Sequence, residues 1–123
     1  MSEYQAGVCN IGPAEIHRRY QVAIVASVLY LLTAIALISS GESSIVRLVA
    51  FIPAMAASVG YIQARRKFCL AYGFAGLFSF QRVGDVTKVA DTAALKADRA
   101  YALKILLLSL IPATVMTAVL YLF

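Results

Sequence analysis

The sequence predicts an all-α integral membrane protein: a helical hairpin, an interfacial or re-entrant segment, an amphipathic connector and a third transmembrane helix. Hydrophobic residues make up 62% of the 123 residues and charged residues only 14%, whereas soluble domains are about half apolar and about a quarter charged. The apolar residues also gather in long blocks, near 20–39, 45–62 and 105–123. A soluble chain of this size cannot bury so much apolar surface. The lipid bilayer must therefore solvate much of it.

The first apolar block has a clear helix start. Gly12-Pro13-Ala14-Glu15 places proline at the first helical position and a carboxylate in the first turn, where it complements the helix dipole. A helix from Pro13 to Ser39 would be about 40 Å long, which exceeds the roughly 30 Å hydrocarbon core. We expect its first two turns to lie at the membrane interface and a tight polar turn to follow, at 39–44.

The second block contains two features that interrupt a simple span. Arg47 lies near its start, from where it can snorkel to the surface, and Pro53 predicts a kink. Small residues recur at near-helical spacing and predict a helix-packing face, here called the small-residue face: Ala50, Ala54, Ala57 and Ser58. This face fits either packing within the hairpin or a dedicated oligomer contact.

The run 68–80 is apolar and aromatic but too short to cross a membrane. A run of this length is typical of a half-helix at the interface or a re-entrant segment. We therefore divide the chain into a hairpin unit with its interfacial segment, 1–80, and a second unit, 81–123.

The second unit is predicted to start with an amphipathic helix along the cytoplasmic face. Small apolar residues recur every three or four positions between 81 and 104, with charged residues between them: Val83, Val86, Val89, Ala93, Ala97 and Ala100. Asp91 is suited to cap a helix that continues into the last block, where Pro112 predicts a bend.

The basic residues predict the orientation of the chain. With three spans, only Arg47 falls on one side and ten Lys or Arg residues fall on the other: Arg18, Arg19, Arg65, Arg66, Lys67, Arg82, Lys88, Lys96, Arg99 and Lys104. Cytoplasmic loops carry the excess of Lys and Arg. We therefore expect a multi-pass inner (cytoplasmic) membrane protein with a cytoplasmic N-terminus.

The residue inventory predicts neither an enzyme nor a cofactor. The chain has one histidine, His17, and no phosphate-binding glycine loop or nucleophile elbow. No ionisable residue lies deep in an apolar block, where proton and ion pathways usually place one. We expect no bound metal. The basic residues border the membrane and do not belong to a separate nucleic-acid-binding domain, so we expect no nucleic acid partner.

The two cysteines form a candidate thiol pair. Cys9 precedes the first helix and Cys69 follows the second, so an antiparallel hairpin brings both to the same end. Nearby basic residues favour thiolate and would suit soft-metal or persulfide chemistry. Packing is the alternative, because a cysteine often serves as a small buried hydrophobe.

Two short motifs resemble a known family, the small inner-membrane hairpin domain of the YgaP type, which occurs alone or fused to a rhodanese. Asn10, Gly12, Glu15 and Arg19 fit its opening motif, and the run Phe68-Cys69-Leu70-Ala71-Tyr72-Gly73 roughly fits its closing motif. The proline that follows the closing cysteine in the family is missing here, and 81–123 lies outside the pattern. The resemblance covers about residues 8–80. It implies a hairpin that pairs with a copy of itself or a membrane partner, and an association with sulfur compounds.

Three functional hypotheses follow. The first is a non-catalytic scaffold or accessory subunit that packs with itself, as a homo-oligomer, or with another membrane protein, docking through the small-residue face. The second is a homo-oligomeric conduit for a small solute such as a sulfur species. The third is a cytoplasmic-face thiol site at Cys9 and Cys69 for metal or persulfide handling.

Overall fold

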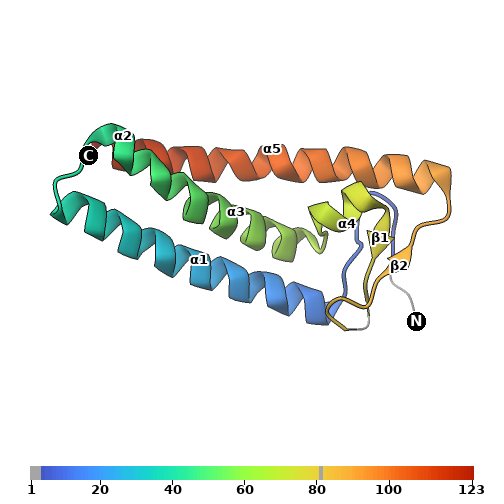
Figure 1. Ribbon diagram of the computed structural model, residues 1–123. Coiled ribbons are helices and arrows are strands. Elements are labelled where there is room, and N and C mark those ends of the chain that lie inside the picture. The colour runs from blue at the N-terminus through green and yellow to red at the C-terminus, as the bar shows by residue number, and fades with distance from the viewer. Residues whose placement is uncertain (1–3, 81) are drawn as a thin grey trace.

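Three long helical segments lie side by side in the computed structural model (Figure 1). They are α1 (Pro13–Ser39), a segmented helix made of α2 (Ser44–Arg47), the 3-10 turn η1 (Leu48–Ala50) and α3 (Phe51–Arg66), and α5 (Thr92–Leu122). Each is long and apolar enough to cross a membrane. The protein is therefore a mostly helical, multi-pass membrane protein with three candidate spans, and α3 packs against both α1 and α5.

The structure describes residues 4–80 and 82–123. Position 81, the first residue of the predicted second unit, and positions 1–3 of the first unit lie outside the described residues.

Helix α1 has the predicted bounds. Gly12 is its extended N-cap and Pro13 its first residue, as expected for a residue whose missing N–H costs nothing there. After Ser39 the chain turns at Gly41, whose φ of +69° is readily adopted only by glycine. Glu15 is in the first turn, as predicted, but its carboxylate is buried.

The second span is broken where proline removes a backbone donor. Pro53 cannot donate to the carbonyl of Val49, and Val49 lies in the 3-10 turn η1. Arg47 Nη1 donates to the Leu120 carbonyl at 3.3 Å, so its charge lies against the C-terminal end of α5, where a helix dipole favours a cation.

The segment between the second and third spans contains a short helix and a small antiparallel ladder. Within the run 68–80, predicted as a half-helix, only α4 (Leu70–Ala75) is helical, and residues 77–78 form a strand. Strands β1 (Leu77–Phe78) and β2 (Thr87–Lys88) then pair, with Leu77 opposite Lys88 and Phe78 opposite Thr87.

The predicted amphipathic helix from 81 is therefore wrong for residues 82–91, where turns and β2 are found. Gly84, at φ +84°, takes a conformation that does not occur within a right-handed helix. Asp91 is the helix N-cap, as predicted, and accepts a hydrogen bond from the Ala94 amide at 3.1 Å.

Helix α5 buries one continuous stripe along its whole length. The stripe is built mostly from small residues at spacings of three and four: Ala94, Asp98, Ala102, Ile105, Ser109, Ala113, Thr117 and Leu120. The predicted register is wrong, because Ala93 and Ala100 are exposed. Close approach of helices in lipid depends on such small residues, and here they allow α3 and α4 to pack against α5.

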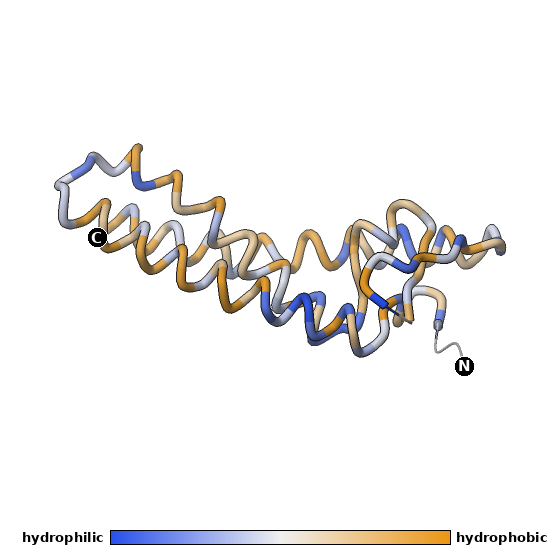
Figure 2. The backbone as a smooth tube through the Cα atoms, turned by 60° about the horizontal axis from the view of Figure 1, so that its bottom comes forward, coloured by the Kyte–Doolittle hydropathy of each residue, from blue (hydrophilic) through white to orange (hydrophobic). Residues whose placement is uncertain are grey.

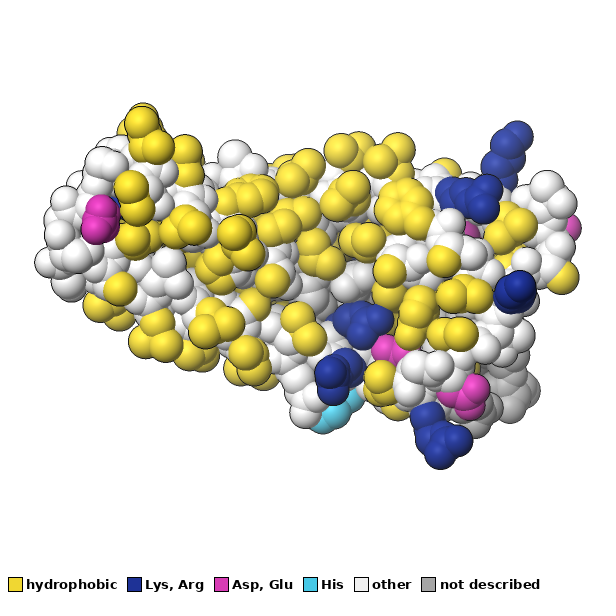
Figure 3. All heavy atoms as spheres, in the orientation of Figure 1, with side chains coloured by type: hydrophobic (Ala, Val, Ile, Leu, Met, Phe, Trp, Pro, Cys, Tyr) yellow, Lys and Arg dark blue, Asp and Glu magenta, His cyan; other side chains and the backbone are white. Residues whose placement is uncertain are grey.

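One end of the helical bundle carries a compact unit of mixed polarity, here called the cap: residues 4–12, the first two turns of α1, residues 69–80 and 82–91 with α4, β1 and β2, and the first turns of α5. Hydropathy is high along the helices and mixed in the cap (Figure 2). On the face shown in Figure 3, hydrophobic side chains cover the helices and most Lys and Arg side chains gather at the cap end. The cap brings together the opening and closing motifs singled out in the sequence.

Candidate functional site

The opening motif binds the closing motif through Asn10. Its side chain is fully buried; Nδ2 donates to the Cys69 carbonyl at 3.1 Å, and Oδ1 accepts from the Cys69 amide at 2.7 Å. The Asn10 amide donates to the Lys67 carbonyl at 3.2 Å. One asparagine thus binds both backbone groups of Cys69, whose carbonyl also accepts from the Gly73 amide at 2.9 Å as the N-cap of α4.

Gly12 lies where two backbone segments touch. Ile11 and Ser79 form a parallel bridge, and the Gly12 amide donates to the Ser79 carbonyl at 2.8 Å. A Cβ added at Gly12 would lie 2.8 Å from the Phe80 carbonyl oxygen. Glycine is needed here for close approach of the backbones, since its φ of −97° suits any residue.

Glu15 is the centre of a buried polar cluster. Its Oε2 accepts from the Tyr72 hydroxyl at 2.6 Å and from the Gly84 amide at 3.1 Å, and its Oε1 lies 3.1 Å from Arg19 Nη1. Among the described residues, Oε1 has no hydrogen-bond partner besides this ion pair with Arg19. Arg19 Nη2 in turn donates to Cys69 Sγ at 3.1 Å. The cluster ties α1, α4 and the segment before β2 together.

A second buried carboxylate, Asp98 on α5, holds the N-terminal segment. The Tyr4 hydroxyl donates to Oδ2, and the Gly7 amide donates to Oδ1 at 2.7 Å. The Tyr4 ring also stacks on Phe78 of β1, with centroids 4.7 Å apart. Asp98 is completely buried, and these two donors supply the hydrogen bonds that a buried carboxylate requires.

Both phenols in these clusters resist ionisation. Burial and the hydrogen bond to Glu15 raise the pKa of Tyr72 to about 12. Burial and the hydrogen bond to Asp98 raise the pKa of Tyr4 as well. At neutral pH both side chains are therefore protonated donors, and neither has the pKa near 7 that suits an acid–base catalyst.

The two thiols lie in different surroundings. Cys69 is buried and its sulfur accepts from Arg19, whereas the partly exposed Cys9 donates from Sγ to the Ile11 carbonyl at 3.5 Å. Cys9 also lines a small cavity of about 320 Å³ beside Lys67. Asn10 brings the backbones at 10 and 69 together, but the two sulfurs contact different groups. The thiol pair stays a prediction.

The small-residue face lies inside the chain. Ala50 and Ala54 are fully buried, and Ala57 and Ser58 are nearly so. The Ser58 hydroxyl donates to the Ser109 carbonyl of α5 at 2.7 Å. The face is therefore used for packing within the chain, one of the two uses expected from the sequence, and it is covered by α1 and α5.

Sequence reasoning missed Tyr4, Tyr72 and Asp98 as partners in the clusters. Tyr72 occurs in the closing motif, which is the one local signal that could have marked it. Asp98 is one of the charged residues that fall between the recurring Val and Ala positions of 81–104, which predicts a polar helix face for it. The Ala94, Asp98, Ala102 spacing is the signal that places it on the buried face.

Comparison with family models, with curated proteins and with solved structures finds no match to this chain.

Proposed function

We propose that the protein is a non-catalytic scaffold or accessory subunit of the inner membrane, which packs through α1 with a second copy of itself. The cap would lie in the cytoplasm. The support comes from the charge distribution, from the outer surface of α1 and from the closed chemistry of the cap.

The charge distribution supports the orientation. The cap end carries Arg18, Arg19 and the run Arg65-Arg66-Lys67, whereas the opposite end carries Arg47, which binds the Leu120 carbonyl. An excess of Lys and Arg marks the cytoplasmic side. The cap and the N-terminus are accordingly inside.

The observation that carries the proposal is a heptad stripe on α1. Along its 27 residues α1 buries only Glu15, Ala23 and Ala26 within the chain. Five large apolar residues recur at alternating spacings of four and three, here called the seam, and each is 36% to 65% exposed: Ile24, Val28, Leu31, Ile35 and Ile38. This 3.5-residue period lets two helices coil around each other, while lipid contact requires no particular spacing.

The polar groups buried in the cap are bound to one another, which supports a structural role for them. The carboxylates of Glu15 and Asp98 are engaged by donors from other segments of the chain. The Tyr72 phenol, with its pKa of about 12, holds its proton at neutral pH. These groups stabilise the fold of the cap and leave α1 as the surface offered to a partner.

Disulfide crosslinking tests the proposal. In a background with Cys9→Ser and Cys69→Ala, we expect Leu31→Cys to crosslink two copies in membranes under mild oxidation. The matched controls are Leu29→Cys, at similar depth on another side of α1, and Val115→Cys on α5. Both controls are comparably exposed, at 51% and 57%, and should stay monomeric.

Each outcome bears on the proposal. Equal crosslinking at Leu31 and Leu29 would mean random collision and would reject the seam. A fixed complex with a different membrane protein, in a native extract, would keep the scaffold role and replace the second copy. A ring of several copies would instead favour a homo-oligomeric conduit, because three spans enclose no pore alone.

The contact between Arg19 and Cys69 favours a second candidate function, a thiol site. Arg19 Nη2 donates to Cys69 Sγ at 3.1 Å, so a polar group orients the sulfur of a residue type that binds soft metals and carries persulfide sulfur. Replacing Cys69 by Ser should abolish function under this candidate and change it little under the scaffold proposal. Growth or complex assembly with the Cys69→Ser chain separates the two.

A further inference from the structure

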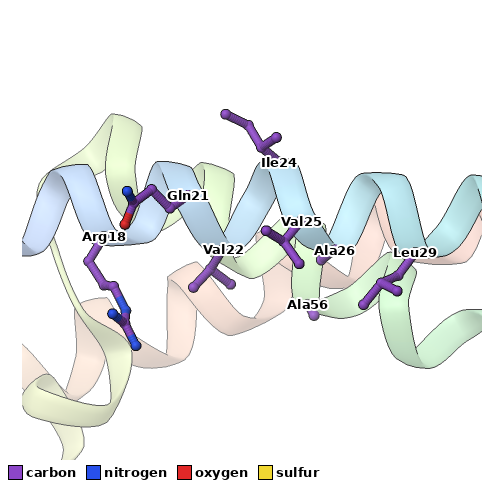
Figure 4. Close-up of a pocket in the computed structure, with 8 residues that line it drawn as sticks. All are labelled: Arg18, Gln21, Val22, Ile24, Val25, Ala26, Leu29 and Ala56. Atoms are coloured by element: carbon purple, nitrogen blue, oxygen red, sulfur yellow. The ribbon is translucent and has the colours of Figure 1, made fainter.

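A groove on the surface of α1 and α3 has the shape and chemistry of a lipid site. It encloses about 640 Å³ and is lined by Val22, Val25, Leu29 and Ala56, with Arg18 and Gln21 at its cap end. Figure 4 shows that Arg18, Val22 and Leu29 point to one side of α1 and Ile24 points to the opposite side. Ile24, the first residue of the seam, also lines the groove, so the groove borders the seam at this position.

The groove exists because small residues form its floor. Ala26 of α1 is 5% exposed and Ala56 of α3 is short, so the larger side chains of Val22 and Leu29 stand above them. From Arg18 to Leu29 the groove follows α1 for about 16 Å, at 1.5 Å per residue. This length matches one leaflet, since half the hydrocarbon core is roughly 15 Å.

The polar end of the groove carries a positive charge that the chain does not neutralise. Among the described residues, no hydrogen bond or ion pair engages the Arg18 guanidinium, whereas neighbouring Arg19 is paired with Glu15. Arg18 and Gln21 are both exposed. Guanidinium binds phosphate in a forked geometry, and the Gln21 amide offers further donors.

We propose that this groove binds one anionic phospholipid, with an acyl chain along Val22, Val25 and Leu29 and the headgroup phosphate against Arg18 and Gln21. Charge complementarity selects the occupant: a zwitterionic lipid would satisfy the apolar groove equally well but leave the arginine charge less well neutralised. The site adds a lipid preference that the scaffold role does not require.

The absence of tryptophan from the chain allows a clean test by fluorescence quenching. We would place the reporter Val25→Trp in the groove and Val115→Trp on α5, whose side chain is also lipid-exposed at 57%. Each protein would be reconstituted in phosphatidylcholine vesicles that contain small amounts of phosphatidylglycerol brominated on its acyl chains. A basic residue near the surface favours anionic lipid by about fivefold, so we expect the groove reporter to need about fivefold less brominated lipid for half-quenching.

Charge variants then locate the headgroup. Arg18→Gln should remove the difference between the reporters, Arg18→Lys should keep most of it, and Arg65→Gln, an exposed arginine at the same end of the bundle, should leave it unchanged. Equal quenching of both reporters in the unmodified background would overturn the proposal. So would an Arg18→Gln variant that still prefers the anionic lipid, or equal loss with Arg65→Gln, because attraction to the general basic surface would then explain the result.

Discussion

The cap and the membrane bundle are held together in different ways. In the cap, two buried carboxylates and one buried asparagine collect hydrogen bonds from segments far apart in the sequence. In the bundle, helices meet through alanine, glycine and serine, with single hydrogen bonds between spans such as Tyr30 to the Met116 carbonyl at 2.8 Å. Lipid supplies no hydrophobic driving force between helices, so the association of the spans depends on van der Waals packing at close contact and on interhelical hydrogen bonds.

The two regions should therefore respond differently to the loss of single residues. The stability of the cap is concentrated in a few polar residues whose loss would leave buried charges and donors unpaired. The stability of the bundle is spread over many small contacts, each of low energy. We therefore expect the loss of one polar residue to destabilise the cap more than the loss of one small contact destabilises the bundle.

Replacing Glu15 by Ala should have the largest effect. It removes the carboxylate that pairs with Arg19 and accepts from the Tyr72 hydroxyl and the Gly84 amide, and breaking a buried ion pair costs about 3–5 kcal/mol. We expect hydrogen exchange in the cap to speed up strongly while the spans stay helical. The matched control is Glu42→Ala, an exposed glutamate in the turn between the first two spans; if it were equally harmful, the buried cluster would not be the cause.

Replacing Gly12 by Ala should have the next largest effect. The added Cβ would lie 2.8 Å from the Phe80 carbonyl, and overpacking costs about 1–3 kcal/mol. The comparison is Gly60→Ala in the bundle, where the new Cβ would meet backbone atoms of Arg19 and Ala23 at 3.1 Å. Detergent-unfolding curves should show the larger loss for Gly12, and the reverse order would contradict the contrast.

Replacing Ser58 by Ala should have a small effect although the residue is buried. It removes the hydrogen bond to the Ser109 carbonyl, and such bonds between transmembrane helices average about 0.6 kcal/mol. The same unfolding assay checks the value. A loss as large as that of Glu15→Ala would show that the bundle also depends on a single polar contact.

Raising the pH should weaken the cap only under alkaline conditions. The pKa of Tyr72 is raised from 10.0 in the unfolded reference to about 12 in the fold, so the folded state prefers the protonated phenol. This stabilisation is fully present below pH 10.0 and is lost as the pH rises toward about 12. Tyrosinate absorbance and the rate of hydrogen exchange in the cap should rise together in this window. Tyr72→Phe should remove the part of the pH dependence of stability that comes from Tyr72.

The sequence predicts the bundle far better than the cap. Three apolar blocks, Pro13 and Asp91 define the spans and their starts, because these signals are local. The cap depends on contacts such as Tyr4 with Asp98, 94 positions apart, which no periodicity reveals. The valines at 83, 86 and 89 have a helix-like spacing, but residues 82–91 form turns and a strand because of the positive φ of Gly84 and the pairing of β1 with β2. The four residues of the small-residue face are buried between the helices, a location that their spacing alone left open between packing within the chain and an oligomer contact.

Labelling of the two cysteines with a membrane-impermeant thiol reagent tests the central claim, a closed cap on the cytoplasmic side of three spans. The reagent would be applied to right-side-out and inverted vesicles, with the labelled residues identified by mass spectrometry. We expect the partly exposed Cys9 to react only in inverted vesicles. The buried Cys69, 3% exposed, should react in neither until the protein is denatured. Labelling of Cys69 as fast as Cys9, or labelling of Cys9 from the outside, would contradict the account.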